Sequence, residues 1–394
     1  MVRPQSLAIG LATLLAALGL GAYWLTSDSG SADLQTSVSV ADAMESDTVG
    51  YRRATTVPDF SFPADHGPHP DYKNEWWYLT GNLSGPDGRP FGYELTIFRF
   101  ALAPPSDTTA PRSASDWRTD QFYMGHFAVT DSTGQAFYAD ERFGRGGAGL
   151  AGAQADPFRV WLEDWAMEST GESSGEDPFP MRLRAQQEGA AIDLTVRPEK
   201  PRVLQGDRGL SQKGPGSGNA SYYYAYTRLA TEGTIVSGTD TTEVTGQSWM
   251  DREWSTSALG PDQEGWDWFA LQLDDGRDLM YYQLRNTDGS PSSFSEGTIV
   301  GPDGSTTTIG RDDVTLKVLD TWTTPDGTRT YPVEWRLEIP SADVDVRISS
   351  LMENQEMDVS VRYWEGAVRV RGSDTGRGYV ELTGYGDSAA SPAS

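Results

Sequence analysis

The 394-residue chain contains no cysteine, and histidine and lysine are scarce. The lack of cysteine excludes thiol catalysis, thiolate metal ligands and disulfide bonds. It also leaves no residue for a lipoprotein-type anchor. Because disulfide bonds are excluded, an exported form of the protein must take its stability from its core. Arginine supplies most of the positive charge, because the chain has only four lysines: Lys73, Lys200, Lys213 and Lys317.

Positive charge is in deficit overall, since the formal net charge is -26. Binding to the phosphate backbone of a nucleic acid requires clustered cations, so the composition predicts no nucleic-acid partner. Acidic, lysine-poor surfaces are typical of proteins in salty surroundings, where screening shortens the reach of self-repulsion. We therefore interpret the charge as an acidic, halophilic adaptation and not as a binding site.

The chain has one long hydrophobic run, from residue 7 to residue 25, preceded by Arg3. About 19 residues at roughly 1.5 Å each are enough to cross a bilayer as a helix. Residues 1–25 are therefore expected to be a signal peptide or a retained membrane anchor, with Tyr23 and Trp24 at the interface. Polar residues 26–56 read as a flexible linker. Together these features predict an exported, extracytoplasmic or periplasmic protein that contacts the membrane through residues 7–25.

From Phe60 onward the pattern is that of β-strands. Apolar and polar residues alternate, for example over 93–97, 191–196 and 333–339, and Asp-Gly turns separate such runs. After the hydrophobic run we find no helical stretch of three turns. The sequence predicts an all-β protein of antiparallel barrel or sandwich type. For a chain of this length we expect two domains, at 57–235 and 236–386, and a tail at 387–394.

Five segments, at 66–81, 123–127, 246–254, 265–269 and 363–366, concentrate tryptophan, tyrosine, histidine and carboxylates beyond the needs of a strand core, and seven segments in all carry recognisable motifs. In order they are EWWYLTGNL, YMGHFAVTD, YYYAYTRLATEG, GQSWMDREWS, GWDWFALQLDDG, YWEGAVRVRG and GYVELTGYG. In these segments the chain resembles the AttH/CrtC family, which includes AttH-type secreted hydrolase-like proteins and the carotenoid 1,2-hydratases (hydroxyneurosporene synthase-like). The resemblance runs from about residue 57 to residue 386.

The resemblance implies two lipocalin-like β domains and, for the hydratase branch, addition of water to an isolated C=C bond without a cofactor. Such chemistry needs an acid that protonates the alkene to a carbocation, which water then captures. Burial must keep that acid protonated at working pH. Electron-rich ring faces must stabilise the cation, and tryptophan offers the best of these.

Residue by residue, the resemblance places the catalytic aspartate of the hydratases on Asp251 in SWMDREW. Two positions earlier, where hydratases often have tyrosine, this chain has Trp249. Upstream histidine and tryptophan of the hydratases fall near Tyr222–Tyr224, where this chain has tyrosines. The residues expected to line the ligand cavity are Trp77, Tyr224, Trp249, Trp254, Trp266, Trp268 and Trp364. The residues expected to support them with polar groups are His66, Glu75, His126, Glu253 and Glu365.

Several of these residues also have a purely structural reading. Asp251 and Glu253, which share a strand face, could belong to a charged turn. His126 has apolar neighbours, as a core histidine would. Trp76 and Trp77 must point to opposite faces of a strand, so one of them is expected in a core. A buried Glu75 would need Lys73 or Arg99 as partner.

The loop HGPHPDYKNE, residues 66–75, holds two of the three histidines. Its spacing lacks the pattern of a zinc protease, so we expect no metal, and we place both histidines at the rim of a cavity whose wall begins at Trp76. A serine hydrolase is not predicted, because the G-x-S-x-G match at residues 171–175 falls in a polar segment expected to be a surface loop, and the all-β pattern offers no strand-to-helix turn for a nucleophile elbow.

The sequence leaves three functions open. The first is an envelope protein that binds an apolar, chain-like lipid or isoprenoid and hydrates its C=C bond as a cofactor-independent hydro-lyase. The second is a non-catalytic carrier of a lipid or envelope component that works with an ABC transporter permease. The third is a structural module that docks through Trp77 or Trp364.

Overall fold

The computed structural model describes residues 48–105, 119–171, 175–257 and 259–385. The predicted anchor at 1–25, most of the predicted linker and the tail at 387–394 lie outside these ranges. Within them, no helix is both long enough and apolar enough to cross a membrane.

The described chain is almost entirely β, with two antiparallel sheets that follow one another in sequence. The strands of the first sheet are β1 (Asn74–Ser84), β2 (Pro90–Ala101), β3 (Gln121–Asp131), β4 (Ala136–Arg145), β5 (Ala151–Ala155), β6 (Phe158–Leu162), β7 (Trp165–Ser169), β8 (Met181–Gln187), β9 (Ala190–Pro198), β10 (Val203–Leu204), β11 (Leu210–Gln212), β12 (Ala220–Ser237) and β13 (Asp240–Ser255). Their order is β4-β3-β2-β1-β13-β12-β9-β8-β7-β6-β5, and β10 and β11 pair with β12.

The second sheet contains the remaining described strands. They are β14 (Gln263–Leu273), β15 (Asp278–Asn286), β16 (Glu296–Val300), β17 (Thr306–Gly310), β18 (Thr315–Thr323), β19 (Thr330–Ile339), β20 (Val344–Ser350), β21 (Glu356–Met357), β22 (Tyr363–Gly372) and β23 (Gly376–Leu382). Their order is β17-β16-β15-β14-β23-β22-β20-β19-β18, with β21 on β22. Three short 3-10 turns complete the described elements: η1 (Ala64–His66), η2 (Arg311–Asp313) and η3 (Pro340–Ala342).

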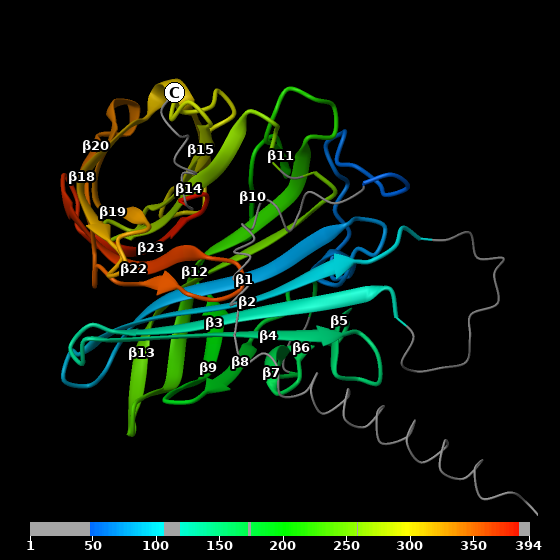
Figure 1. Ribbon diagram of the computed structural model, residues 1–394, viewed down its shortest axis with the longest axis horizontal. Helices are drawn as coiled ribbons and strands as arrows, with labels where there is room; N and C mark the ends of the chain where they lie inside the picture. Colours follow the sequence, from blue (N-terminus) through cyan, green and yellow to red (C-terminus); the bar gives the residue numbers. More distant parts are fainter. Residues whose placement is uncertain (1–47, 106–118, 172–174, 258, 386–394) are drawn as a thin grey trace, which may run out of the picture. The chain divides into compact units, whose positions relative to one another are not determined.

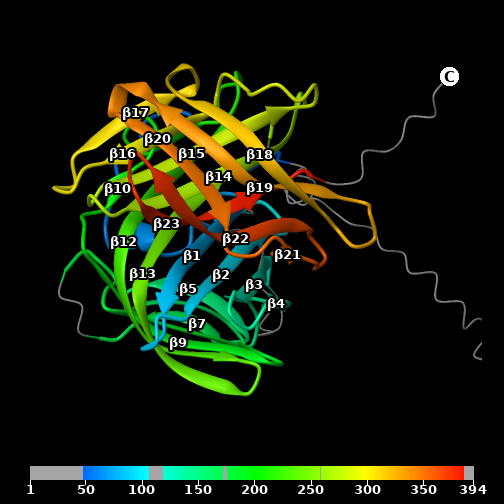
Figure 2. The same cartoon turned by 90° about the vertical axis from the view of Figure 1, so that its left-hand side faces the viewer.

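The prediction of two lipocalin-like β units is confirmed. One sheet is nearly closed into a barrel and the other forms a half-barrel, and Figure 1 shows the second sheet as a ring of strands. Each sheet encloses its own apolar core, and a third apolar cluster joins β1, β12 and β13 of the first sheet to β14, β15, β22 and β23 of the second. Figure 2 shows β22 and β23 beside β1 and β2, in agreement with the contacts between these strands.

The sheets change later in the chain than the predicted domain boundary. A boundary near residue 235 falls inside β12, whereas the first sheet continues to the end of β13 at Ser255. The polar segment at 238–241, which resembles a linker in sequence, contains a tight hairpin turn: Ser237 pairs with Asp240, and Gly238 has a φ of +65°. Glycine suits this turn because it adopts positive φ without a steric penalty.

Candidate functional site

A cavity of about 110 Å³ lies between the two sheets. Its walls combine aromatic rings with four carboxyl side chains and one ammonium group. The lining residues are Trp76, Tyr78, Phe98, Lys213, Ser221, Tyr223, Asp251, Glu253, Ser255, Ser257, Leu259, Trp266, Trp268, Tyr282, Leu284, Tyr363, Glu365 and Glu381. The structure therefore brings together five of the residues singled out from the sequence: Asp251, Glu253, Trp266, Trp268 and Glu365.

The alternation of side chains along β13 explains which residues reach the cavity. In a strand, successive side chains point to opposite faces, so Asp251 and Glu253 share one face and Arg252 takes the other. The strand register pairs Tyr78 of β1 with Asp251, and Trp76 with Glu253. These side chains meet the second sheet, whereas the opposite face of both strands fills the core of the first sheet.

The same alternation operates in the second sheet. Trp268 of β14 lies opposite Glu381 of β23, and Glu381 lies opposite Glu365 of β22. All three side chains line the cavity, while Trp364, one residue before Glu365, points into the core of the second sheet.

Asp251 is held firmly in the cavity wall, and its side chain is almost completely buried. The Tyr223 hydroxyl donates a 2.5 Å hydrogen bond to Oδ2, and the Trp249 indole N–H donates a 2.7 Å bond to Oδ1. Burial raises the pKa of Asp251 to about 7, against the effect of these two hydrogen bonds, which favour the carboxylate. At neutral pH the group is therefore poised to give or to take a proton.

Glu253 lies next to Asp251 on the same face and has its own partners. The Ser221 hydroxyl donates to Oε1, and the Lys213 ammonium lies 3.5 Å from the same oxygen. Lys213 also lies 3.9 Å from the ring centroid of Tyr282. Glu253 thus has an ammonium group and a serine hydroxyl as partners, whereas Asp251 has a tyrosine hydroxyl and an indole N–H.

Two further acids form the opposite side of the cavity. The Tyr78 hydroxyl donates a 3.1 Å hydrogen bond to Glu365 Oε2, and the Trp266 indole donates a 3.0 Å bond to Glu381 Oε1. Burial raises the pKa of Glu365 well above its ordinary value, and the negative charges of Glu381 and Glu94 act in the same direction. Burial also raises the pKa of Glu381 to about 8. At neutral pH this side of the cavity is thus largely uncharged.

The rings around the acids pack edge to face. Trp268 lies 6.2 Å from Trp249 and 5.2 Å from Tyr78, with interplanar angles of 85° in both pairs. Trp249 is not part of the lining, but its hydrogen bond to Asp251 fixes the acid from behind. Trp266 and Trp268 both line the cavity, and an indole ring is the aromatic side chain best suited to attract a cation.

His126 does not line the cavity itself, but it contacts Tyr363, which does. Its Nδ1 lies 2.6 Å from the hydroxyl of Tyr363, which lines the cavity, and its Nε2 lies 3.0 Å from Glu141 Oε1. Both ring nitrogens have partners, so the histidine is fully buried but satisfied.

The loop histidines do not lie at the cavity rim. His66 is buried in the first sheet, where Nδ1 lies 2.7 Å from the Tyr224 hydroxyl and Nε2 lies 2.8 Å from the Glu176 carbonyl oxygen. Burial lowers the pKa of His66 to about 4. His69 stacks on Trp254 at 3.8 Å between ring centroids. Among the described residues, no group of three or more histidines and carboxylates is arranged to hold a metal ion.

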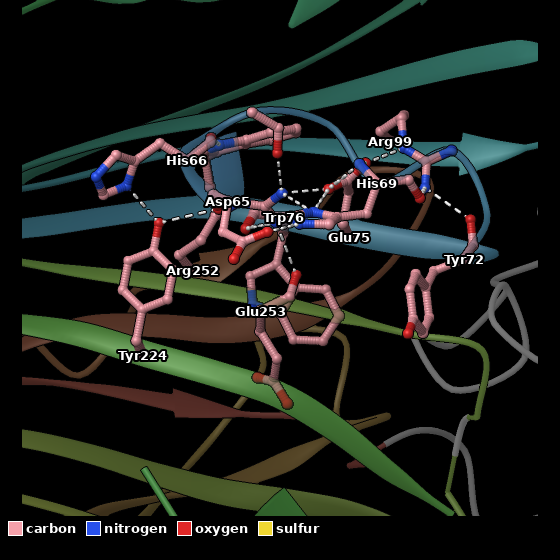
Figure 3. Close-up of polar contacts among 12 residues, drawn as sticks. Asp65, His66, His69, Tyr72, Glu75, Trp76, Arg99, Tyr224, Arg252 and Glu253 are labelled. Atoms are coloured by element: carbon pink, nitrogen blue, oxygen red, sulfur yellow. Dashed lines mark hydrogen bonds and ion pairs between the residues drawn. The ribbon is translucent and has the colours of Figure 1, made fainter. Parts of the chain in front are cut away.

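Glu75 is the centre of a buried ion cluster inside the first sheet, drawn in Figure 3. It forms ion pairs with Arg99, one of the two partners that the sequence left open, and with Arg252, which the sequence did not suggest. All three side chains are at most 1% exposed. Although burial opposes it, the two guanidinium groups hold the pKa of Glu75 well below its ordinary value. This carboxylate is charged, paired and separate from the cavity.

Besides Trp249, four aromatic residues that were expected to line the cavity lie in the cores of the two sheets. Trp77, Tyr224 and Trp254 belong to the core of the first sheet, and Trp364 belongs to the core of the second. The Trp77 ring lies under the guanidinium of Arg252 at 4.0 Å, and its indole N–H bonds to the His66 carbonyl. As predicted, Trp76 and Trp77 separate: Trp76 faces the cavity and Trp77 the core.

The sequence reasoning missed several polar members of the cavity, among them Tyr78, Tyr223, Tyr363 and Glu381. Each of these four stands within one of the seven motif segments. Tyr78 and Tyr363 lie two residues from Trp76 and Glu365 respectively, so the two-residue period of a strand was the signal that could have identified them.

Glu94 on β2 gives a testable pH dependence. Burial raises the pKa of this carboxyl to about 8, whereas the unfolded chain has an ordinary value near 4.5. The folded state therefore keeps a proton that the unfolded state loses, and this contribution to stability disappears as the pH rises from about 4.5 through 8. We expect Glu94→Gln to lose less stability than the wild type between pH 5 and pH 8, because its unfolding releases about one proton fewer.

Urea unfolding at both pH values measures this difference. Glu232→Gln is the matched control, because that carboxyl is 61% exposed and pairs with Arg197 at the surface. Its pH dependence should match that of the wild type. Parallel curves for the wild type and Glu94→Gln would show that Glu94 does not hold a proton in the folded state.

Fold and site together define a protein with two lipocalin-like β units and an acidic, aromatic cavity between them. The chain belongs to the AttH-like family, which it matches over residues 53–385. A crystal structure described as AttH, from Nitrosomonas europaea, is 34% identical, with a TM-score of 0.73 over 85% of this chain and 99% of the other.

Two relatives with named activities are more distant. The fold is similar to that of kievitone hydratase from Nectria haematococca, with a TM-score of 0.61 and 16% identity over 84% of this chain and 95% of that one. Dehydratase asqC of Emericella nidulans is 23% identical over 193 residues, which are 46% of this chain and 52% of that protein. The match thus spans about half the length of this curated relative.

Proposed function

We propose that the protein is a cofactor-independent hydro-lyase that adds water to a C=C bond, or removes it in reverse, with Asp251 as the acid and base. One observation carries the proposal: a nearly fully buried aspartic acid with a pKa of about 7, fixed by Tyr223 and Trp249 in the wall of an aromatic cavity. The names of a hydratase with the same fold and of a dehydratase among the relatives support the same reaction class.

The reaction follows from the geometry of Asp251. In hydration the protonated carboxyl transfers its proton to one alkene carbon, and the π electrons form the new C–H bond. The positive charge on the other carbon faces the rings of Trp266 and Trp268, which stabilise it by cation–π attraction. Water attacks this carbon, and its proton returns to the Asp251 carboxylate, which restores the acid. Dehydration runs through the same steps in the opposite order.

The two hydrogen bonds to Asp251 serve both halves of this cycle. Tyr223 and Trp249 donate to different oxygens, so they stabilise the carboxylate that forms when the proton leaves. Burial works against them and keeps the acid form accessible near neutral pH. An exposed aspartic acid would be ionised at this pH and could not protonate an alkene.

Cavity size limits the substrate. Ligand pockets usually measure about 300–1,000 Å³, whereas this cavity is about 110 Å³. A long isoprenoid or lipid chain can therefore place only one end beside Asp251. We propose that the reacting C=C bond is near an end of the substrate.

Incubation in H₂¹⁸O tests the function. The wild type is mixed with a panel of terminal and trisubstituted alkenes and with the corresponding tertiary alcohols, and the products are analysed by mass spectrometry. Hydration should give alcohols that carry ¹⁸O, and dehydration should give alkenes. Turnover of no compound, together with a lipid retained at one equivalent in native mass spectra of protein from its own host, would contradict the proposal and favour a non-catalytic carrier.

A further inference from the structure

The acid pair on β22 and β23 leaves one oxygen without a partner. Glu365 and Glu381 lie directly opposite one another and both line the cavity. Glu365 Oε2 accepts the hydrogen bond from Tyr78, but Oε1 has no hydrogen-bond partner among the described residues. The side chain is fully buried, so bulk water does not satisfy this atom.

An unpartnered buried polar atom is costly, and native structures usually provide a partner for it. Here the neighbouring groups determine which kind of partner fits. Like charges directly opposite one another destabilise a sheet, so Glu365 and Glu381 are not both ionised. Burial and the neighbouring acids raise the pKa of Glu365 well above its ordinary value, so its carboxyl carries a proton at neutral pH. Because Oε2 is occupied as an acceptor, Oε1 is the free site for a donating O–H.

We propose that the substrate carries a neutral, hydrogen-bond-accepting oxygen of the carbonyl type, and that Glu365 Oε1–H binds it while the C=C bond lies at Asp251. This rests on the proposed function, because it names the substrate class of the same cavity. A pure hydrocarbon would leave the Glu365 donor unpartnered. A carboxylate would meet four carboxyl groups in the lining and one ammonium group, that of Lys213.

Two small probes differ only in this oxygen. 6-Methyl-5-hepten-2-one has a ketone and a trisubstituted alkene, and 2-methyl-2-heptene has the alkene alone. Binding is measured by quenching of tryptophan fluorescence, because Trp266 and Trp268 line the cavity. We expect the wild type to bind the ketone roughly tenfold more tightly than the hydrocarbon, in line with one hydrogen bond to an otherwise unsatisfied buried group.

Variants of Glu365 distinguish the effect of the hydrogen bond on binding from the effect of cavity shape. Glu365→Met should abolish the preference, whereas Glu365→Gln, whose amide still donates, should keep part of it. Glu334→Met on β19 is the control, because that carboxyl pairs with Arg347 outside the cavity lining, and it should leave the preference unchanged. Equal affinities for the two probes in the wild type, no binding of the ketone, or a preference that survives in Glu365→Met would each overturn the proposal.

A second measurement needs no variant that might fail to fold. The infrared C=O stretch of ¹³C-labelled ketone, bound to the wild type, should lie below its frequency in a hydrocarbon solvent, because a hydrogen bond weakens the C=O bond. An unshifted frequency would contradict the proposal.

These binding results are independent of catalysis. A preference for the ketone without turnover would support the proposed role of Glu365 in binding and contradict the proposed hydratase function. Turnover of the ketone and of the hydrocarbon with equal kcat/KM would support the proposed hydratase function and contradict the proposed role of Glu365.

Discussion

Replacement of Asp251 by asparagine is expected to lower kcat/KM by roughly 10²–10⁴-fold, the usual contribution of a positioned general acid. Asparagine keeps the shape of the side chain and an oxygen acceptor, but it has no proton to transfer to the alkene. Because the wild-type carboxyl accepts bonds from Tyr223 and Trp249, one of these bonds should persist in the variant. The loss should therefore appear in turnover more than in folding, as measured by steady-state kinetics and thermal unfolding together.

The pH profile gives a second signature of the same group. Hydration requires the protonated acid, and the pKa of Asp251 is about 7. For the wild type, kcat/KM for hydration should fall as the pH rises through about 7, since this parameter reports ionisation of the free enzyme. Asp193→Asn, a surface change on β9 where the carboxylate pairs with Arg182, is the control and should keep both rate and profile. Equal product from the wild type and Asp251→Asn would remove Asp251 from the mechanism.

The largest effect on stability is expected at Glu75. In Glu75→Gln the guanidinium groups of Arg99 and Arg252 lose the carboxylate that compensates them, although both stay buried. Breaking a buried ion pair in this way costs roughly 3–5 kcal/mol in the free energy of unfolding. Glutamine has nearly the same volume, so packing contributes little to this change. Urea denaturation at neutral pH measures the difference.

A surface pair provides the comparison. Glu232→Gln removes the partner of Arg197, where both side chains are about half exposed, and should change the free energy of unfolding by less than about 1 kcal/mol. The pKa of Glu75 is depressed in the folded state, so its stabilising contribution is complete at neutral pH and decreases only in acid, below the unfolded value near 4.5. If Glu75→Gln were as mild as Glu232→Gln, the ion cluster would not be a major source of stability.

Much of the architecture could be predicted because strands leave a clear two-residue pattern. Alternation identified the all-β fold, placed Asp251 and Glu253 on one face and separated Trp76 from Trp77. The family motifs supplied the lipocalin-like units, which spacing alone could not specify.

The assignment of rings to the cavity was less predictable, for a physical reason. Both faces of β1 and β13 are buried, one in the core of the first sheet and the other against the second sheet. Hydrophobicity therefore does not distinguish the two faces, and the sequence does not show that Trp249 faces the second sheet while Trp254 faces the core of the first. Only the pairing of distant strands shows that Glu381 faces Glu365, since these residues belong to different motifs.

The position of the domain boundary depended on a similar ambiguity. The residues of a tight hairpin turn and of a linker have the same polar, glycine-containing composition. At 238–241 the chain turns from β12 into β13 and does not leave the first sheet. Strand β13 then contributes Asp251 to the cavity.

The alternation of β13 also separates two properties along one strand. Residues 249, 251 and 253 face the second sheet, whereas 250, 252 and 254 maintain the first unit. A combinatorial library that randomises positions 249 and 253 and keeps Asp251 together with residues 250, 252 and 254 would therefore change the surroundings of the acid while the acid itself and the core of the first unit stay as they are. The same arrangement would let natural descendants diverge in chemistry while they inherit one scaffold.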